Sequence, residues 1–118
     1  MASLKHVIPF DTDAIEPCEI VTSDPAAVDR PYQARSWRHF QKAERGATAG
    51  IWEAEAHLER IDCGYDELCH ILEGSVRLTN LAGDSQTFGP GDSFVVAAGF
   101  KGIWENLTPV RKVFFILA

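Results

Sequence analysis

Apolar and polar residues alternate over short distances along most of the chain, from about Ala47 to Ala118. The alternating segments are separated by turn-forming sequences such as residues 81–84 (LAGD) and 89–92 (GPGD). Glycine tolerates backbone angles that other residues avoid, and proline presets one of those angles, so both sequences predict reversals of the chain. Many short strands joined by tight turns are typical of an all-β barrel.

The segment from Ile51 to Ile61 shows the alternation over its full length. Successive side chains of a strand point to opposite sides of the sheet. We therefore expect one strand with an apolar face in the core and an acidic face in water. The core face would carry Trp52, Ala54, Ala56 and Leu58. The solvated face, which we do not expect to bind a metal, would carry Glu53, Glu55, His57 and Glu59.

Residues 1–33 do not follow this pattern, because prolines at positions 9, 17, 25 and 31 interrupt any long periodicity. We expect an extended N-terminal arm over residues 1–33, followed by one β-barrel domain over residues 34–118. One short apolar run in the arm is suited to lie along a sheet, including a sheet of a neighbouring subunit: Leu4, Val7, Ile8 and Phe10.

The last expected strand, residues 113–117 (VFFIL), is apolar at every position. A strand with one face in water carries polar residues at every second position, so both faces of this strand must be covered. In a two-sheet barrel the interior covers one face, and the N-terminal arm or a second subunit covers the other. We expect a homodimer.

Composition and charge narrow the functional classes. The 118 residues suffice for one domain with a core, and 46% of them are hydrophobic. The net charge is −6 and the basic residues are scattered, so we expect no nucleic-acid partner. No apolar run approaches the ~20 residues of a membrane helix, and residues 1–13 lack the pattern of a cleaved leader. We expect a cytoplasmic protein with no membrane partner.

The three cysteines are an odd number and lack the spacing of a zinc site. Disulfide frameworks are typical of small secreted domains with paired cysteines. We therefore expect reduced thiols at Cys18, Cys63 and Cys69.

A spaced frame runs through the second half of the chain: Glu67, Gly74, Gly91, Gly99, Gly102 and Asn106. The segments DELCHILEGSVRL from Asp66 and FGPGDSFVVAAGFKGIWEN from Phe88 contain this frame, and RKVFFIL follows it. The frame resembles the two-part motif of the cupin superfamily. It resembles in particular the small branch related to the ethanolamine-utilisation Q protein and, more distantly, to ureidoglycine aminohydrolase. The resemblance implies a jelly-roll barrel of two antiparallel sheets.

The resemblance also implies a metal site with three histidines and one glutamate, but most of these ligands are replaced. Glu67 holds the position of the glutamate, and Gly102 that of the third histidine. The first two histidines are replaced by Arg60 with Asp62, or by Ile61 with Cys63. A lone carboxylate holds a divalent ion weakly, and Asp62 would add at most a loose Mg²⁺ or Ca²⁺ site. We expect no tightly bound metal and no cofactor.

Glu67 is the candidate catalytic residue. Alternation places it on one strand face with Cys69 and Ile71, so an acid lies among apolar neighbours. Such an acid is a candidate general acid or base. The alternative is that Glu67 is satisfied by a hydrogen bond from the Trp104 indole or a salt bridge to Arg60.

Alternation along the strand that contains Gly102 and Trp104 predicts a ligand pocket. Gly102 is expected to open space on the interior face, and Trp104, two residues later, to fill part of it. The two indoles of Trp52 and Trp104 are either pocket walls or ordinary core aromatics. The expected lining residues, in which Cys69 is a buried and inert thiol, are Trp52, Glu67, Cys69, Lys101, Trp104 and Asn106.

Three functions are compatible with this pattern. The leading interpretation is a cupin that binds a small organic molecule in the barrel without a tightly held transition metal. Glu67, together with Lys101 or Asn106, would bind the polar groups of this molecule. The second is a metal-dependent cupin enzyme with ligands from unusual positions. The third is a non-catalytic accessory or interaction subunit.

Overall fold

A computed structural model describes residues 4–118, which form ten strands and one 3₁₀ helix. The first three residues of the expected arm lie outside the described residues. In chain order the elements are β1 (Cys18–Thr22), β2 (Tyr32–Lys42), η1 (Ala43–Arg45), β3 (Ala47–Ala54), β4 (His57–Asp62), β5 (Asp66–Glu73), β6 (Val76–Asn80), β7 (Ser85–Phe88), β8 (Ser93–Val96), β9 (Lys101–Asn106) and β10 (Val110–Leu117).

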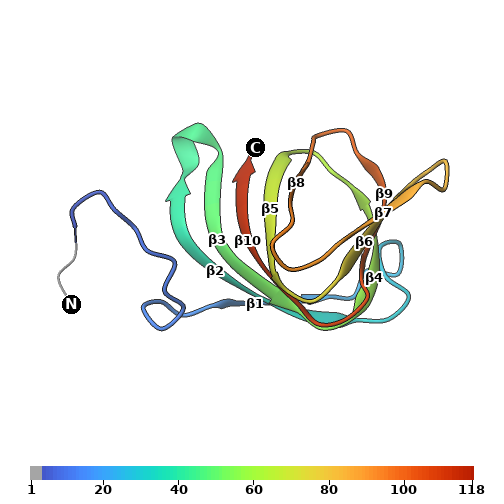
Figure 1. Cartoon of the computed structure of the whole chain (residues 1–118), viewed down its shortest axis with the longest axis horizontal. Coiled ribbons are helices and arrows are strands. Elements are labelled where there is room, and N and C mark those ends of the chain that lie inside the picture. Colours follow the sequence, from blue (N-terminus) through green and yellow to red (C-terminus); the bar gives the residue numbers. More distant parts are fainter. Residues whose placement is uncertain (1–3) are drawn as a thin grey trace.

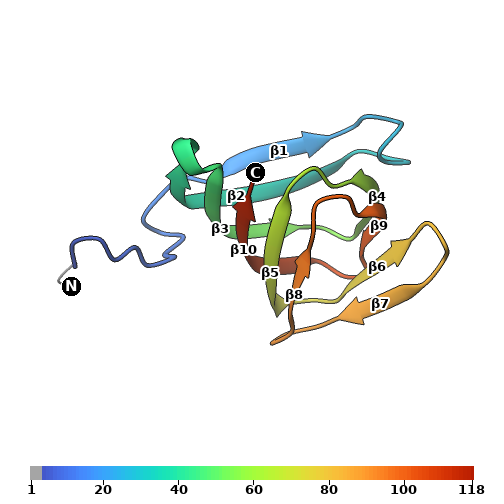
Figure 2. The ribbon, with the colours of Figure 1, turned by 90° about the horizontal axis from the view of Figure 1, so that it is seen from above.

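The strands form two antiparallel sheets that face each other across a common interior (Figure 1). The larger sheet has the order β1-β2-β3-β10-β5-β8, and the smaller one has the order β4-β9-β6-β7. Both sheets curve around the interior but remain separate sheets and do not close into one ring of strands (Figure 2). The expected all-β jelly-roll of two antiparallel sheets is confirmed.

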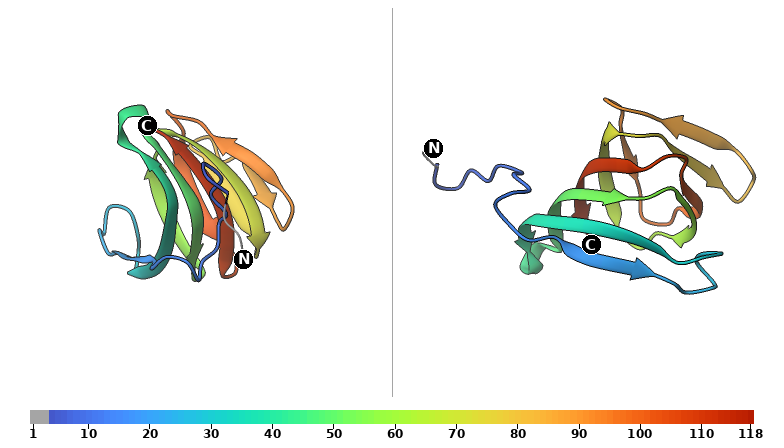
Figure 3. Two further views of the ribbon diagram at one scale, coloured as in Figure 1. Left: turned by 90° about the vertical axis from the view of Figure 1, so that its left-hand side faces the viewer. Right: turned by 90° about the horizontal axis from the view of Figure 1, so that it is seen from below.

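The N-terminal segment contributes an edge strand and a free extension. β1 pairs with β2, and Val28 is buried against Tyr32 in the same region. Residues before β1 run away from the body (Figure 3). One contact returns this segment to β2: Phe10 stacks on His39 with the ring centroids 4.9 Å apart.

The expected single strand over residues 51–61 is wrong, because the chain turns a corner there. β3 ends at Ala54 in the large sheet, and β4 begins at His57 in the small sheet. The two residues between the strands reverse the alternation. His57 and Glu59 therefore face the interior, opposite Asn106 and Trp104 of β9, instead of facing water.

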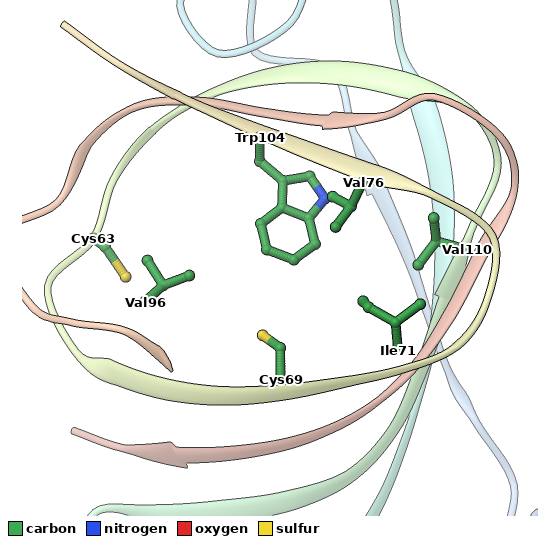
Figure 4. Packing of buried hydrophobic residues seen from close by; sticks show 7 residues of the cluster. All are labelled: Cys63, Cys69, Ile71, Val76, Val96, Trp104 and Val110. Atoms are coloured by element: carbon green, nitrogen blue, oxygen red, sulfur yellow. The ribbon is translucent and has the colours of Figure 1, made fainter. Parts of the chain in front are cut away.

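The main core lies between the sheets (Figure 4). β5 contributes two fully buried side chains to it, Cys69 and Ile71, as alternation predicts. Around them pack residues from several other strands and loops: Cys63, Val76, Val96, Trp104 and Val110. Within residues 4–118, no helix has the length and apolar character needed to span a membrane.

The outer face of the large sheet carries a continuous apolar row. Five residues from neighbouring strands lie opposite one another across the sheet: Phe40, Ala49, Phe115, Leu68 and Val95. Leu68, Val95 and Phe115 are exposed in the single chain. The outer face of β10 is therefore uncovered at Phe115.

Candidate functional site

A cavity of about 660 Å³ lies between the two sheets and is open to solvent. Its wall combines charged, aromatic and aliphatic side chains from both sheets. β10 contributes three of them in alternating positions, Lys112, Phe114 and Ile116. The interior of the fold is thus partly filled by side chains and partly hollow.

An ion pair lies in the wall of this cavity. The Nζ atom of Lys112 donates a hydrogen bond of 2.8 Å to Oε2 of Glu67. The side chains are 7% and 13% exposed, respectively, so both charges are largely removed from water. A buried charge is costly unless it is paired. Each of the two charges is therefore stable in the interior only because the other is present.

Two indole rings enclose the same ammonium group. Nζ of Lys112 lies 4.7 Å from the centroid of the Trp52 ring and 4.2 Å from that of Trp104. A cation over an aromatic face is attracted by the ring's negative face. Burial lowers the pKa of Lys112, but the charge of Glu67, together with Cys69 and the hydrogen bonds to both residues, more than offsets burial and raises that pKa above its ordinary value. Lys112 therefore remains a cation at neutral pH.

Cys69 lies beside the ion pair as a neutral thiol. Its Sγ atom is 3.5 Å from Oε2 of Glu67 and 3.6 Å from Nζ of Lys112. Burial raises the pKa of this thiol to about 12, with the Glu67 carboxylate adding to the shift. A neutral thiol donates a weak hydrogen bond here and has little thiolate character.

The two expected partners of Glu67 are wrong. The Trp104 indole N–H donates to Oδ1 of Asn106 at 2.8 Å. The guanidinium group of Arg60 binds the segment before β2, with Asp29 at 3.0 Å, and not Glu67. The actual partner, Lys112, was not identified from the sequence. Lys112 lies two residues before Phe114 in β10, so the two side chains share the inner face of the sheet.

The other expected pocket residues divide into two groups. Trp52, Glu67 and Trp104 line the cavity. Asn106 is 2% exposed, and its amide is used by the Trp104 indole and by the backbone carbonyl of Glu55. Asn106 therefore holds the Trp104 ring and the β3–β4 corner in place.

Lys101 lies outside the cavity wall. Its side chain is 60% exposed, and its Nζ atom lies 4.0 Å from a carboxylate oxygen of Asp62, which is also exposed. Asp62 lines the cavity, and its exposed carboxylate faces Lys101. Of the expected pocket residues, Cys69 and Asn106 thus lie behind the wall, hydrogen-bonded to Glu67 and Trp104, and Lys101 lies apart from them.

A second polar cluster was missed, because alternation assigned Glu59 and His57 to the solvated face and Tyr32 was placed in the arm. Glu59 and Tyr32 line the cavity, and His57 packs against Tyr32. The Tyr32 hydroxyl donates a hydrogen bond of 2.6 Å to Oε2 of Glu59. The ring of Tyr32 stacks on that of His57, with 3.5 Å between the centroids. Burial, followed by the hydrogen bond to Glu59, raises the pKa of Tyr32, so its hydroxyl stays protonated.

The tautomer of His57 follows from its surroundings. Its Nδ1 atom lies 2.8 Å from the carbonyl oxygen of Glu55, which can only accept a hydrogen bond. Nδ1 therefore carries the proton, and Nε2 is an acceptor. Nε2 is buried and has no hydrogen-bond partner among residues 4–118. Burial lowers the pKa of His57, so the ring is neutral at pH 7.

The residues present do not fit a cupin metal. Of the two possible pairs of positions for the first histidines, Ile61 and Cys63 face the core. Cys63 donates its thiol to the carbonyl of Tyr65 at 3.2 Å. Glu67 already binds an ammonium group. Among the described residues, no three histidine, cysteine or acidic side chains converge as metal ligands.

Gly102 does not open space toward the cavity, contrary to expectation. A Cβ atom at this position would collide with the backbone carbonyl oxygen of Thr79 on the neighbouring strand β6. The glycine is needed for the close approach of β9 to β6. This backbone contact also leaves no room for a histidine there.

Solved structures of similar fold include DUF861 family proteins and an ethanolamine utilization protein Q. A Pseudomonas syringae protein of unknown function from the DUF861 family is 26% identical, with a TM-score of 0.74. The match covers 84% of this chain and 44% of the Pseudomonas protein, so this chain spans less than half of that protein. A DUF861 family protein from Thermotoga maritima is 33% identical over 56% of this chain and 75% of its own, with a TM-score of 0.53.

A putative ethanolamine utilization protein Q from Salmonella typhimurium shares the fold at 14% identity and a TM-score of 0.64, covering 86% of this chain and 95% of its own. No curated protein matches the sequence significantly. The family model of the EutQ-like cupin domain matches residues 41–114, which is more than half of the chain. The chain therefore belongs to the EutQ-like cupin family.

Proposed function

We propose that this chain binds a small organic molecule in the cavity between its two sheets and holds no transition metal tightly there. The observation that carries the proposal is the cavity of about 660 Å³ with the Lys112–Glu67 pair and two indoles in its wall. Small-molecule sites occupy roughly 300–1,000 Å³ and combine apolar walls with a few fixed polar groups. This cavity has both properties.

The ammonium group of Lys112 stands beside the one carboxylate that the cupin metal pattern retains. A divalent ion bound to Glu67 would lie next to this fixed positive charge, within a few ångströms and in surroundings of low dielectric constant. Repulsion at that distance opposes metal binding. Lys112 thus supports the absence of a tightly held metal.

If the bound molecule reacts, Glu67 is the residue that we propose for proton transfer. It lines the cavity, and one of its oxygens is oriented by both Lys112 and Cys69. A base fixed by such contacts is positioned before the substrate arrives. Trp52 and Trp104 would hold apolar parts of the molecule.

Metal analysis tests this proposal. Protein purified without chelator should contain far less than one equivalent of manganese, iron, nickel or zinc. Native mass spectrometry of the same sample should show a small organic molecule bound to a fraction of the chains, or bound after incubation with a metabolite extract. Stoichiometric metal that survives dialysis, with activity restored by adding it back, would establish the metal-dependent enzyme instead.

We also propose that two copies associate through the outer face of the large sheet. The apolar row from Phe40 to Val95 crosses five neighbouring strands there. The N-terminal arm leaves the body at the same face, where Arg111 lies 3.4 Å from the hydroxyl of Thr12. Leu4, Val7 and Ile8 of the arm are exposed in the single chain. A second copy would cover both sets of apolar side chains.

A further inference from the structure

The carboxylate of Glu59 lacks a cationic partner although it lines the cavity. Its side chain is only 24% exposed. In the same cavity wall, Glu67 is paired with Lys112, whereas the neighbouring arginine, Arg60, is bound to Asp29. Within residues 4–118, the one basic side chain within 4 Å of Glu59 is His57, at 3.9 Å. His57 is neutral, so the negative charge of Glu59 is uncompensated.

The two polar side chains in contact with Glu59, Tyr32 and His57, have no free donor to offer its second oxygen. The hydroxyl of Tyr32 already donates its hydrogen bond to Oε2 of Glu59. The proton of His57 is used by the carbonyl of Glu55, which leaves Nε2 as a buried acceptor without a partner in the described part of the chain. Oε1 of Glu59 accepts no hydrogen bond from residues 4–118. This oxygen is not enclosed, so a donor of a bound molecule can reach it, and a largely buried carboxylate gains from a cationic partner.

Aromatic rings border the same position. Tyr32 and Tyr65 line the cavity with Glu59, and Trp52 lies edge-on to His57 at 6.2 Å between the centroids. The faces of such rings attract cations. The positive charge of Lys112 does not oppose a second cation strongly, because Glu67 neutralises it at 2.8 Å.

We propose that Glu59, with Tyr32 beside it in the cavity wall, forms a subsite for the ammonium group of an organic amine. The inference rests on the proposed small-molecule binding and gives the class of ligand. The ammonium group donates hydrogen bonds to the free oxygen of Glu59 and compensates its charge, and the apolar part of the amine lies against Trp52.

Three probes of nearly equal size test the charge preference: benzylamine, benzyl alcohol and benzoate. Titrations are followed by the indole N–H signals in ¹H–¹⁵N spectra. The three tryptophans provide an internal control, because Trp52 and Trp104 line the cavity, whereas Trp37 lies on the outer face beneath Arg111. Benzylamine should shift the signal of Trp52 but not that of Trp37, and should bind at least tenfold more tightly than the other two probes.

A matched pair of variants locates the preference. Glu59→Gln keeps the size of the side chain and an acceptor for Tyr32 but removes the charge, so it should weaken benzylamine binding at least tenfold. Glu105→Gln removes a carboxylate from the other face of the same sheet, where Glu105 binds Arg77 at 2.7 Å. It should leave benzylamine binding unchanged. If Glu59→Gln did not fold, the preference of the unmodified protein among the three probes would decide alone.

The failure of this subsite is distinguishable from the failure of the proposed function. Equal binding of the three probes, or full affinity in Glu59→Gln, would overturn the ammonium subsite while the cavity remained a binding site. Benzylamine that leaves the Trp52 signal unmoved would also overturn it. If benzyl alcohol and benzoate left the Trp52 and Trp104 signals unmoved as well, the proposed binding in the cavity would fail with it.

Discussion

Lys112 and Glu67 stabilise the fold only together, because either one alone would leave a charge in an apolar interior. The carboxylate lies among core side chains of β5, and the ammonium group lies between two indoles. Removing one member of a buried pair costs about 3–5 kcal/mol, whereas replacing both members is often nearly neutral. At the scale of single residues, the pair is thus a coupled unit.

Replacing Lys112 alone should therefore destabilise the protein strongly. Lys112→Met keeps the apolar stem but leaves Glu67 unpaired, and it should lower the free energy of unfolding by roughly 3–5 kcal/mol in urea denaturation. The double variant Lys112→Met/Glu67→Gln should regain at least half of that loss. A single variant as stable as the unmodified protein would show that the pair is not buried in solution.

His57 should make the stability depend on pH. Its pKa is lowered in the folded state by burial, so between pH 6.5 and the lower folded-state value the unfolded chain binds more protons. Its contribution to stability is present above about pH 6.5 and decreases as the pH falls through that window. His57→Phe keeps a ring to stack on Tyr32 but cannot titrate.

The measurement compares denaturation of the unmodified protein and His57→Phe at pH 8 and pH 5. The unmodified protein should be the more stable at pH 8, because the variant loses the hydrogen bond to the carbonyl of Glu55. The difference between the two free energies of unfolding should become smaller at pH 5. A difference that stays constant would mean that His57 titrates normally in the folded state.

At the scale of strands, the site depends on two places where the regular pattern is interrupted. The corner between β3 and β4 turns His57 and Glu59 inward. The close approach of β9 to β6 at Gly102 keeps Trp104 in register opposite Leu78. Both interruptions set which side chains enter the cavity.

An added methyl group at Gly102 should disturb this approach. Gly102→Ala brings a Cβ atom onto the Thr79 carbonyl oxygen, and we expect a loss of roughly 1–3 kcal/mol in the free energy of unfolding. Gly64→Ala is the matched control, since a Cβ atom there meets nothing within 4 Å. Thermal unfolding should show a lower midpoint for the first variant and little change for the second. Equal midpoints would contradict the close contact.

The sequence predicts those parts of the site that lie within one strand. Alternation placed Glu67 and Cys69 on one buried face correctly because both belong to β5. It failed for His57 and Glu59 because a corner between two sheets adds residues that periodicity does not detect. It gave no partner for Glu67 because Lys112 is 45 residues away and reaches it only through the pairing of β5 with β10.

At the scale of the whole molecule, the large sheet separates two environments. Its inner face carries the ion pair and the cavity, and its outer face carries the apolar row and the start of the N-terminal arm. Exposed apolar patches on a single chain commonly mark interfaces. The proposed dimer therefore leaves the cavity residues on the inner face unchanged.

A charge placed in the apolar row should separate the two copies. The unmodified protein should sediment at twice its chain mass of 13.0 kDa at micromolar concentration. Val95→Asp should sediment at the single chain mass, because Val95 lies in the row and is 60% exposed. Leu81→Asp is the control: Leu81 is also exposed but lies in the β6–β7 turn. A 13 kDa species of the unmodified protein would contradict the dimer.

The positive charge beside Glu67 is part of the polypeptide, and this differs from a charge provided by a bound metal ion. A metal ion must be obtained from the medium, and it can be removed by a chelator or exchanged for a competing ion. An ammonium group that belongs to the polypeptide is delivered by translation and remains in place as long as the chain is folded. Cells starved of iron or manganese would therefore produce this protein with its interior charge complete.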